Sequence, residues 1–179
     1  PASTSIGYTL NLSYPTSGIT ETNLRTITYY DNYNFLNYSG WDAEHTNTYY
    51  SYDASGYVLA AKKLSVAKGQ TTGSKVKVLG TSTWLNSATY YDFQYRSIKT
   101  ITENLHGGCD KVFNDPDFVG RERRTKWIHT GLESVTILKE FSYDHAGRLL
   151  TIRQTTGTAS PVILVSNKYT ELGQLIEKN

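Results

Sequence analysis

A tyrosine-aspartate turn motif recurs along this chain and constrains its fold more than any other feature of the sequence. Residues 141–150 are FSYDHAGRLL, and residues 167–176 are NKYTELGQLI. Tyr143 and Tyr169 lie 26 residues apart, and the glycines and leucines that follow them keep the same spacing. A fixed period of this length predicts a tandem-repeat architecture in which each repeat is one supersecondary unit.

Weaker copies of the motif lie upstream. Two periods before Tyr143, the pair Tyr91 and Asp92 recurs, with Tyr95 at the position of the glycine. Residues 117–121 (DFVGR) match the turn with a slip of one residue, and residues 52–56 (YDASG) match it again. The residues expected to have a structural role in these turns are Asp53, Gly56, Asp92, Asp117, Gly120, Asp144, Gly147, Thr170 and Gly173.

The chemistry of an Asp-x-x-Gly stretch favours a tight turn between two strands. Asp is preferred at the first position of a type I turn and Gly at its last. The Asp carboxylate accepts a hydrogen bond from the backbone N–H two residues on. Gly adopts a positive φ at little cost, which allows the bulge that joins a type I turn to twisted strands. Thr170 stands in the place of Asp and is expected to act in the same way more weakly.

Alternating apolar residues on both sides of these turns predict strands. Val135, Ile137, Phe141 and Tyr143 fall on one face of an extended segment. Residues 154–161 are rich in Thr, Gly, Ala and Ser and are expected to form the loop to the next strand, so that each period holds about two strands. The sequence therefore predicts an all-β fold of tandem antiparallel hairpins that form a twisted, continuous sheet.

The first half of the chain is less regular than the second. It carries short β-prone runs punctuated by glycines, and no helical period of ten or more residues is found anywhere in the sequence. We expect residues 1–85 to form a β-rich region that precedes or begins the repeats, and residues 86–179 to form the hairpin repeats. No linker divides them, so one continuous structural unit is expected.

The motifs at residues 141–150 and 169–176 resemble the YD repeats of RHS proteins, and residues 28–33, 78–80 and 88–92 resemble the region before the repeats in large Bacteroidetes-type RHS proteins. The resemblance implies a non-catalytic structural scaffold that is secreted or lies at the cell surface. In full-length relatives such a β-strip winds as a spiral shell around a C-terminal toxin, and cell-surface adhesive proteins share it. The chain departs from the family pattern at Tyr95 and Thr170, and neither a terminal core motif nor a self-cleaving aspartate site is present.

Composition narrows the partners that the chain is expected to have. A net charge of +2 gives no concentrated basic surface for nucleic acid, and no window is apolar enough for a membrane-spanning helix. Cys109 is the single cysteine, so an internal disulfide is excluded. The chain begins at Pro1 without a signal peptide and has no methionine, which leads us to expect a segment of a larger protein.

The unpaired strand edges of truncated repeats predict partners that cover them. We expect these partners to be the remaining segments of the same longer chain, a carrier or secretion-machinery protein, or a second copy of the chain.

Several residue groups have both a catalytic or metal-binding interpretation and a structural one. The turn aspartates resemble catalytic carboxylates or calcium ligands, but each already has a local role as a turn acceptor. His106 and Cys109 have a metal-like spacing without a second pair of ligands nearby. We therefore expect no catalytic residues, no metal and no cofactor.

A basic and aromatic run also raises the possibility of binding single-stranded nucleic acid. It comprises Arg121, Arg123, Arg124, Lys126 and Trp127. On a strand, alternation sends Arg121 and Arg123 to one face and Arg124 and Lys126 to the other, which favours a solvated or shell-lining strand.

The aromatic content of the first half suggests a carbohydrate platform as an alternative to the scaffold. The residues that would stack on sugar faces are Trp41, Tyr49, Tyr50 and Tyr52. Cross-strand aromatic pairing explains the same residues through sheet stabilisation. A cell-surface module that binds carbohydrate or protein is therefore the alternative function.

Overall fold

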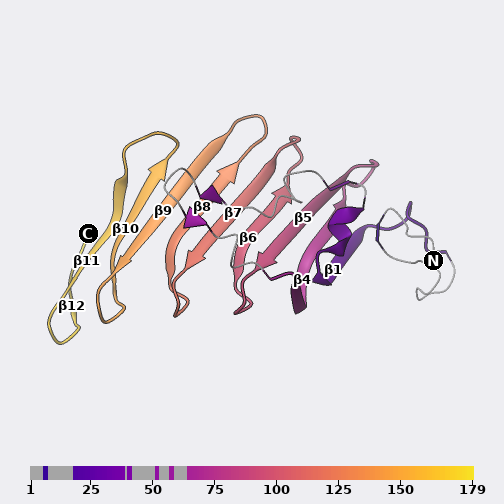
Figure 1. Cartoon of the computed structure of the whole chain (residues 1–179). Coiled ribbons are helices and arrows are strands. Elements are labelled where there is room, and N and C mark those ends of the chain that lie inside the picture. The colour runs from indigo at the N-terminus through magenta and orange to yellow at the C-terminus, as the bar shows by residue number, and fades with distance from the viewer. Residues whose placement is uncertain (1–5, 8–17, 39, 42–50, 53–56, 59–63) are drawn as a thin grey trace. The chain divides into compact units, whose positions relative to one another are not determined.

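The computed structural model describes residues 6–7, 18–38, 40–41, 51–52, 57–58 and 64–179. Their contacts group the chain into two compact units, Pro1–Gly107 and Gly108–Asn179. More than half of the described residues lie in strands, and their only helical element is one 3-10 turn, η2 (Asn34–Asn37). The expectation of an all-β chain built from antiparallel hairpins is confirmed (Figure 1).

The sheet of the first unit holds one long-range pair and two hairpins. Its strands are β1 (Thr26–Asn32), β4 (Val66–Lys77), β5 (Trp84–Tyr91) and β6 (Ser97–Glu103). They pair antiparallel in the order β1-β4-β5-β6. The short strands β2 (Ser51–Tyr52) and β3 (Tyr57–Val58) pair with each other as a separate ribbon.

The second unit is an antiparallel meander in which each strand pairs with the next along the chain. Its strands are β7 (Cys109–Pro116), β8 (Glu122–His129), β9 (Val135–Tyr143), β10 (Leu149–Thr156), β11 (Val162–Tyr169) and β12 (Leu175–Lys178). The register shifts beside the turns of three of its hairpins, β7–β8, β9–β10 and β11–β12. Such a shift is the bulge that accommodates a type I turn between twisted strands.

An aromatic cluster forms the core of the first unit beside β1. Tyr29 and Phe35 stack with their ring centroids 4.5 Å apart, and Trp41 packs within 4.9 Å of the Phe35 ring. A Cβ at Gly73 would lie 2.5 Å from the Phe35 ring, so β4 can pass this cluster only with a glycine there. The cluster anchors η2 and the neighbouring segments against β1 and β4.

Burial continues along β5 and β6, where Ala88, Tyr90, Ile98 and Ile101 are fully buried. Removing a side chain of the size of Ile98 or Ile101 from water stabilises the fold by roughly 1.5–3 kcal/mol. In the second unit most strand residues are only partly buried. Its stability therefore depends more on cross-strand contacts and on the turns than on a closed core.

The boundary between the two compact units lies between Gly107 and Gly108, in the connection from β6 to β7. The sequence predicts that the hairpin repeats start at residue 86. This boundary describes the repeat pattern and not the grouping of contacts into compact units, so it remains a prediction. Among the described residues, no helix has the length and apolarity needed to cross a membrane.

Candidate functional site

The turn at Asp144 shows how the repeat motif is built. The backbone N–H groups of Ala146 and Arg148 each donate to Oδ1 of Asp144 at 2.9 Å, and Nε of Arg148 donates to Oδ2 at 2.6 Å. The N–H of Gly147 donates to the carbonyl oxygen of Asp144 at 2.9 Å and closes the turn. Both carboxylate oxygens are therefore engaged by the turn itself.

The same arrangement occurs at the two other described turn aspartates. Oδ1 of Asp92 accepts from the N–H of Gln94 and of Arg96, both at 2.9 Å, while Nε of Arg96 donates to Oδ2 at 2.7 Å. Asp117 accepts from the backbone and from the guanidinium of Arg121. An arginine thus follows each of these aspartates by four residues, a partner that the sequence reasoning missed although its spacing repeats.

These contacts keep the carboxyl groups ionised. Burial alone would raise the pKa of Asp92, but the hydrogen bonds from Arg96 and Gln94 outweigh it and hold the pKa below its ordinary value of 3.8. The pKa values of Asp117 and Asp144 are lowered for the same reasons, with the backbone and guanidinium of the following arginine as the main partners. A carboxylate held in this way is suited to maintaining a turn and not to exchanging a proton at neutral pH.

Within the second unit, the arginine of one turn reaches the tyrosine of the next hairpin. The guanidinium of Arg121 lies 5.0 Å from the ring centroid of Tyr143, and that of Arg148 lies 4.7 Å from the ring centroid of Tyr169. The hydroxyl of Tyr143 donates to the carbonyl oxygen of Glu122 at 2.8 Å. We call these Asp–Arg–Tyr contacts, formed by Asp117, Arg121, Tyr143, Asp144, Arg148 and Tyr169, the turn ladder.

Glycines make room for the turn ladder. A Cβ at Gly147 would lie 2.5 Å from Nη1 of Arg121, and a Cβ at Gly173 would lie 2.9 Å from Nη1 of Arg148. Both glycines also have positive φ, 82° and 88°. The motif therefore favours glycine for the turn conformation, and a side chain there would also displace the guanidinium of the preceding arginine.

The other turn residues predicted from the sequence lie partly within the described residues. Gly120 has φ 92°, and Thr170 accepts at its hydroxyl oxygen from the N–H of Gln174 at 3.1 Å. Tyr95 occupies the glycine position of its turn with φ 61°. Asp53 and Gly56 lie outside the described residues.

Of the aromatic platform predicted from the sequence, only Trp41 has a described side chain. Tyr49 and Tyr50 lie outside the described residues, and for Tyr52 only the backbone, in β2, is described. Trp41 packs edge-on against Tyr29 at a centroid distance of 6.1 Å. Trp41 is therefore part of the packing around the core cluster.

The other groups singled out in the sequence have local partners. The buried Cys109 has its N–H bonded to the hydroxyl of Thr130 at 2.9 Å. Arg123 pairs with Asp115 at 2.7 Å, and Arg124 pairs with Glu140 at 3.2 Å. Across the described residues, no group of three His, Cys, Asp or Glu side chains is placed to hold a metal ion.

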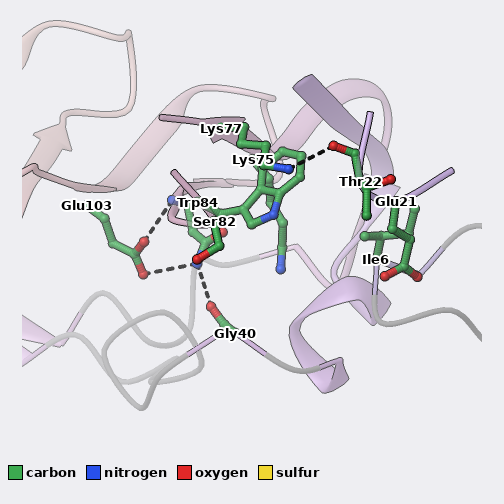
Figure 2. Close-up of a pocket in the computed structure, with 10 residues that line it drawn as sticks. Ile6, Glu21, Thr22, Gly40, Lys75, Lys77, Ser82, Trp84 and Glu103 are labelled. Atoms are coloured by element: carbon green, nitrogen blue, oxygen red, sulfur yellow. Dashed lines mark hydrogen bonds between the residues drawn. The ribbon is translucent and has the colours of Figure 1, made fainter. Parts of the chain in front are cut away.

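A cleft of about 560 Å³ opens beside β4, β5 and β6 in the first unit (Figure 2). A volume of this size falls in the range of small-molecule sites. Sequence reasoning missed the cleft, because its residues are far apart in the chain. It is lined by Ile6, Glu21, Thr22, Gly40, Lys75, Lys77, Ser82, Trp84, Asn86 and Glu103.

Asn86 and Glu103 form a fixed polar pair in this cleft. One carboxylate oxygen of Glu103 accepts from the backbone N–H of Asn86 at 2.9 Å, and the other accepts from its side-chain amide at 3.1 Å. The same amide also donates to the carbonyl oxygen of Gly40. Asn86 is only 4% exposed, and its Oδ1 has no hydrogen-bond donor among the described residues.

Two lysines approach tryptophan rings at the cleft. Nζ of Lys77 lies 5.7 Å from the ring centroid of Trp84 and donates to the carbonyl oxygen of Thr22 at 2.9 Å. Nζ of Lys75 lies 5.2 Å from the ring centroid of Trp41. Burial lowers the pKa of Lys75, while the negative charges of nearby glutamates, Glu103 foremost, act in the opposite direction.

Comparison with known proteins assigns no family to the chain. No protein-family model matches its sequence, and a comparison with curated proteins gives no match. The resemblance to YD repeats therefore stands on the recurring motifs alone.

Proposed function

We propose that this chain is a non-catalytic scaffold segment of an RHS/YD-repeat protein. Its hairpins contribute to a β-shell that encloses or displays a C-terminal, toxin-like segment of a longer chain, which is secreted or lies at the cell surface. The proposal rests on the motif resemblance and on one structural observation, the turn ladder.

The turn ladder supports a structural role because it accounts for the residue types of the motif. Asp144 uses both carboxylate oxygens inside its own turn. The ring of Tyr143 contacts the guanidinium of Arg121, and its hydroxyl donates a hydrogen bond to the backbone of the preceding hairpin. The polar residues of the motif, which a catalytic interpretation would assign to substrate binding, thus contact the turn itself and the neighbouring hairpin. A repeat whose neighbours are linked in this way is suited to building an extended sheet.

The test is to isolate the native protein from its source and to determine its intact mass, with peptide mapping beyond Pro1 and Asn179. The proposal expects a longer chain with a distinct C-terminal segment that resists added protease while the hairpins are folded. Variants Arg121→Gln and Arg148→Gln in that chain are expected to make the segment cleavable, whereas Arg153→Gln, at an exposed position, is expected to leave it protected. A native chain of 179 residues, or a segment cleaved as fast as a free peptide, would contradict the shell.

The second candidate function is a surface module that binds a carbohydrate or a protein. The cleft beside β4, β5 and β6 favours it, because the scaffold function gives no reason for a cavity with a buried acceptor on Asn86 that has no donor among the described residues.

A further inference from the structure

The cleft of the first unit combines an aromatic ring, buried polar groups and balanced charge. Trp84 is partly buried where it packs against the core cluster, and it also lines the cleft. In Figure 2 its indole lies between Lys77 and Glu103, the carboxylate that accepts hydrogen bonds from Asn86. Rings in such positions present a flat apolar surface beside hydrogen-bonding groups.

The charges in the cleft favour a ligand without net charge. Lys75 and Lys77 contribute two cations, and Glu21 and Glu103 contribute two carboxylates, so the lining charges sum to zero. An anion would meet both carboxylates, and a cation would meet both lysines. Because burying an unmatched charge is costly, a neutral ligand is preferred.

The polar groups match a ligand that both donates and accepts hydrogen bonds. Asn86 and Glu103 are fixed by the bonds between them, at 2.9 and 3.1 Å, so little entropy is lost in ordering them. Oδ1 of Asn86 adds an acceptor that has no donor among the described residues. Ser82, an exposed hydroxyl at the rim, both donates and accepts.

We propose that this cleft binds a neutral saccharide, with its apolar C–H face on Trp84 and its hydroxyls on Asn86, Glu103 and Lys75. A sugar ring offers an apolar face and several hydroxyls that act as donor and acceptor, which is the combination that the cleft presents. The proposal rests on the second candidate function and is independent of the scaffold. It also assigns residues outside the aromatic set predicted from the sequence.

The first experiment uses the whole chain on an array of neutral and acidic oligosaccharides, followed by titration with the neutral ligands that bind, read by tryptophan fluorescence and by calorimetry. Because Trp84 packs against the core, its removal also risks the fold. The blocking variant is therefore Ser82→Trp, which fills the cleft from an exposed position. Its matched control is Ser160→Trp, also at an exposed position but in the second unit.

The expected result is binding of at least one neutral saccharide that Ser82→Trp weakens by about tenfold or more, which corresponds to the loss of one good contact. Ser160→Trp is expected to retain the affinity of the unmodified chain, and unchanged thermal unfolding of both variants shows that the fold is intact. Binding of acidic saccharides alone, blocked by Ser82→Trp, would overturn the neutral ligand class while keeping the binding function. No saccharide binding, or binding that Ser82→Trp leaves unchanged, would overturn the site.

Discussion

Among the described repeated turns, Tyr95 is the one residue other than glycine at the position with a left-handed backbone. It occupies the glycine position with φ 61°, where Gly120, Gly147 and Gly173 have φ between 82° and 92°. A left-handed backbone brings the Cβ of an L-residue close to a carbonyl oxygen and costs roughly 1–2 kcal/mol. The turn at Asp92 nevertheless closes, because the N–H of Tyr95 donates to the carbonyl oxygen of Asp92 at 2.9 Å.

Replacing this residue by glycine is therefore expected to stabilise the chain. Tyr95→Gly removes the strain, and the side chain that it deletes is 45% exposed. The greater freedom of glycine in the unfolded state offsets part of the gain, so the free energy of unfolding is expected to rise by up to about 1 kcal/mol. Chemical denaturation measures it. A fall in stability would show that the Tyr95 side chain makes contacts worth more than the strain.

Acid is expected to weaken the turns through their aspartates. Asp92 is fully buried, and its pKa is lower in the folded chain than its ordinary value of 3.8. The unfolded chain therefore takes up the proton first as the pH falls, so the contribution of Asp92 is complete above about pH 4 and is lost as the pH falls through its folded pKa. We expect Asp92→Asn to lower stability at pH 7 and to flatten the loss of stability in acid.

The measurement is the free energy of unfolding from denaturant titrations across the acidic range, for the unmodified chain and for Asp92→Asn. Parallel curves for the two chains would contradict the assignment, because the acid-sensitive contribution of Asp92 would then be absent.

At the scale of the hairpin, the turn ladder couples neighbouring elements. Arg148 belongs to the turn between β9 and β10, and Tyr169 ends β11. A cation over an aromatic ring at such a partly exposed site contributes about 0.5–1 kcal/mol. A double-mutant cycle of Arg148→Gln and Tyr169→Leu is expected to give a coupling energy of this size.

The matched control for this cycle is Arg153→Gln combined with Tyr169→Leu. Arg153 is an exposed arginine on the adjoining strand β10. The effects of Arg153→Gln and Tyr169→Leu on the free energy of unfolding are expected to be additive. If the effects of Arg148→Gln and Tyr169→Leu on the free energy of unfolding were also additive, the turn ladder would not couple the hairpins.

The hairpins were predictable from the sequence because their signals are local. Asp144 and Gly147 lie within one turn, and the alternation that marks β9 is read from consecutive residues. The contact from Arg121 to Tyr143 was not predicted, since it joins two hairpins and depends on where the strands pair. Register places these side chains together, and the turn motif alone does not specify it.

The cleft depends even more on long-range pairing. Trp84 and Asn86 alternate along β5, but Lys75 comes from β4 and Glu103 from β6. The register that pairs Lys75 with Asn86 sets two of these residues side by side. Only Trp41, among the aromatic residues expected to bind a ligand, has a described side chain, and it packs around the core. The aromatic content of the sequence suggested that aromatic residues bind a ligand, but composition does not specify which of them line a cavity.

At the scale of the whole chain, the second unit leaves apolar side chains in water at its C-terminal strands. Val162, Ile163, Leu164, Leu175 and Ile176 are between 46% and 64% exposed. Among the described residues of this unit, β12 pairs only with β11 and so presents an open edge. Exposed apolar side chains and an unpaired edge both favour association.

We therefore expect the chain, when free of other partners, to self-associate with increasing concentration. The variant Ile163→Lys with Ile176→Lys places charge on this surface and is expected to shift light scattering towards the monomer mass. Thr158→Lys, at an exposed loop position, adds charge elsewhere and is expected to leave the association unchanged. Monomer mass for the unmodified chain at high concentration would contradict the prediction. An equal shift in both variants would mean that net charge, and not the apolar strands β11 and β12, controls the association.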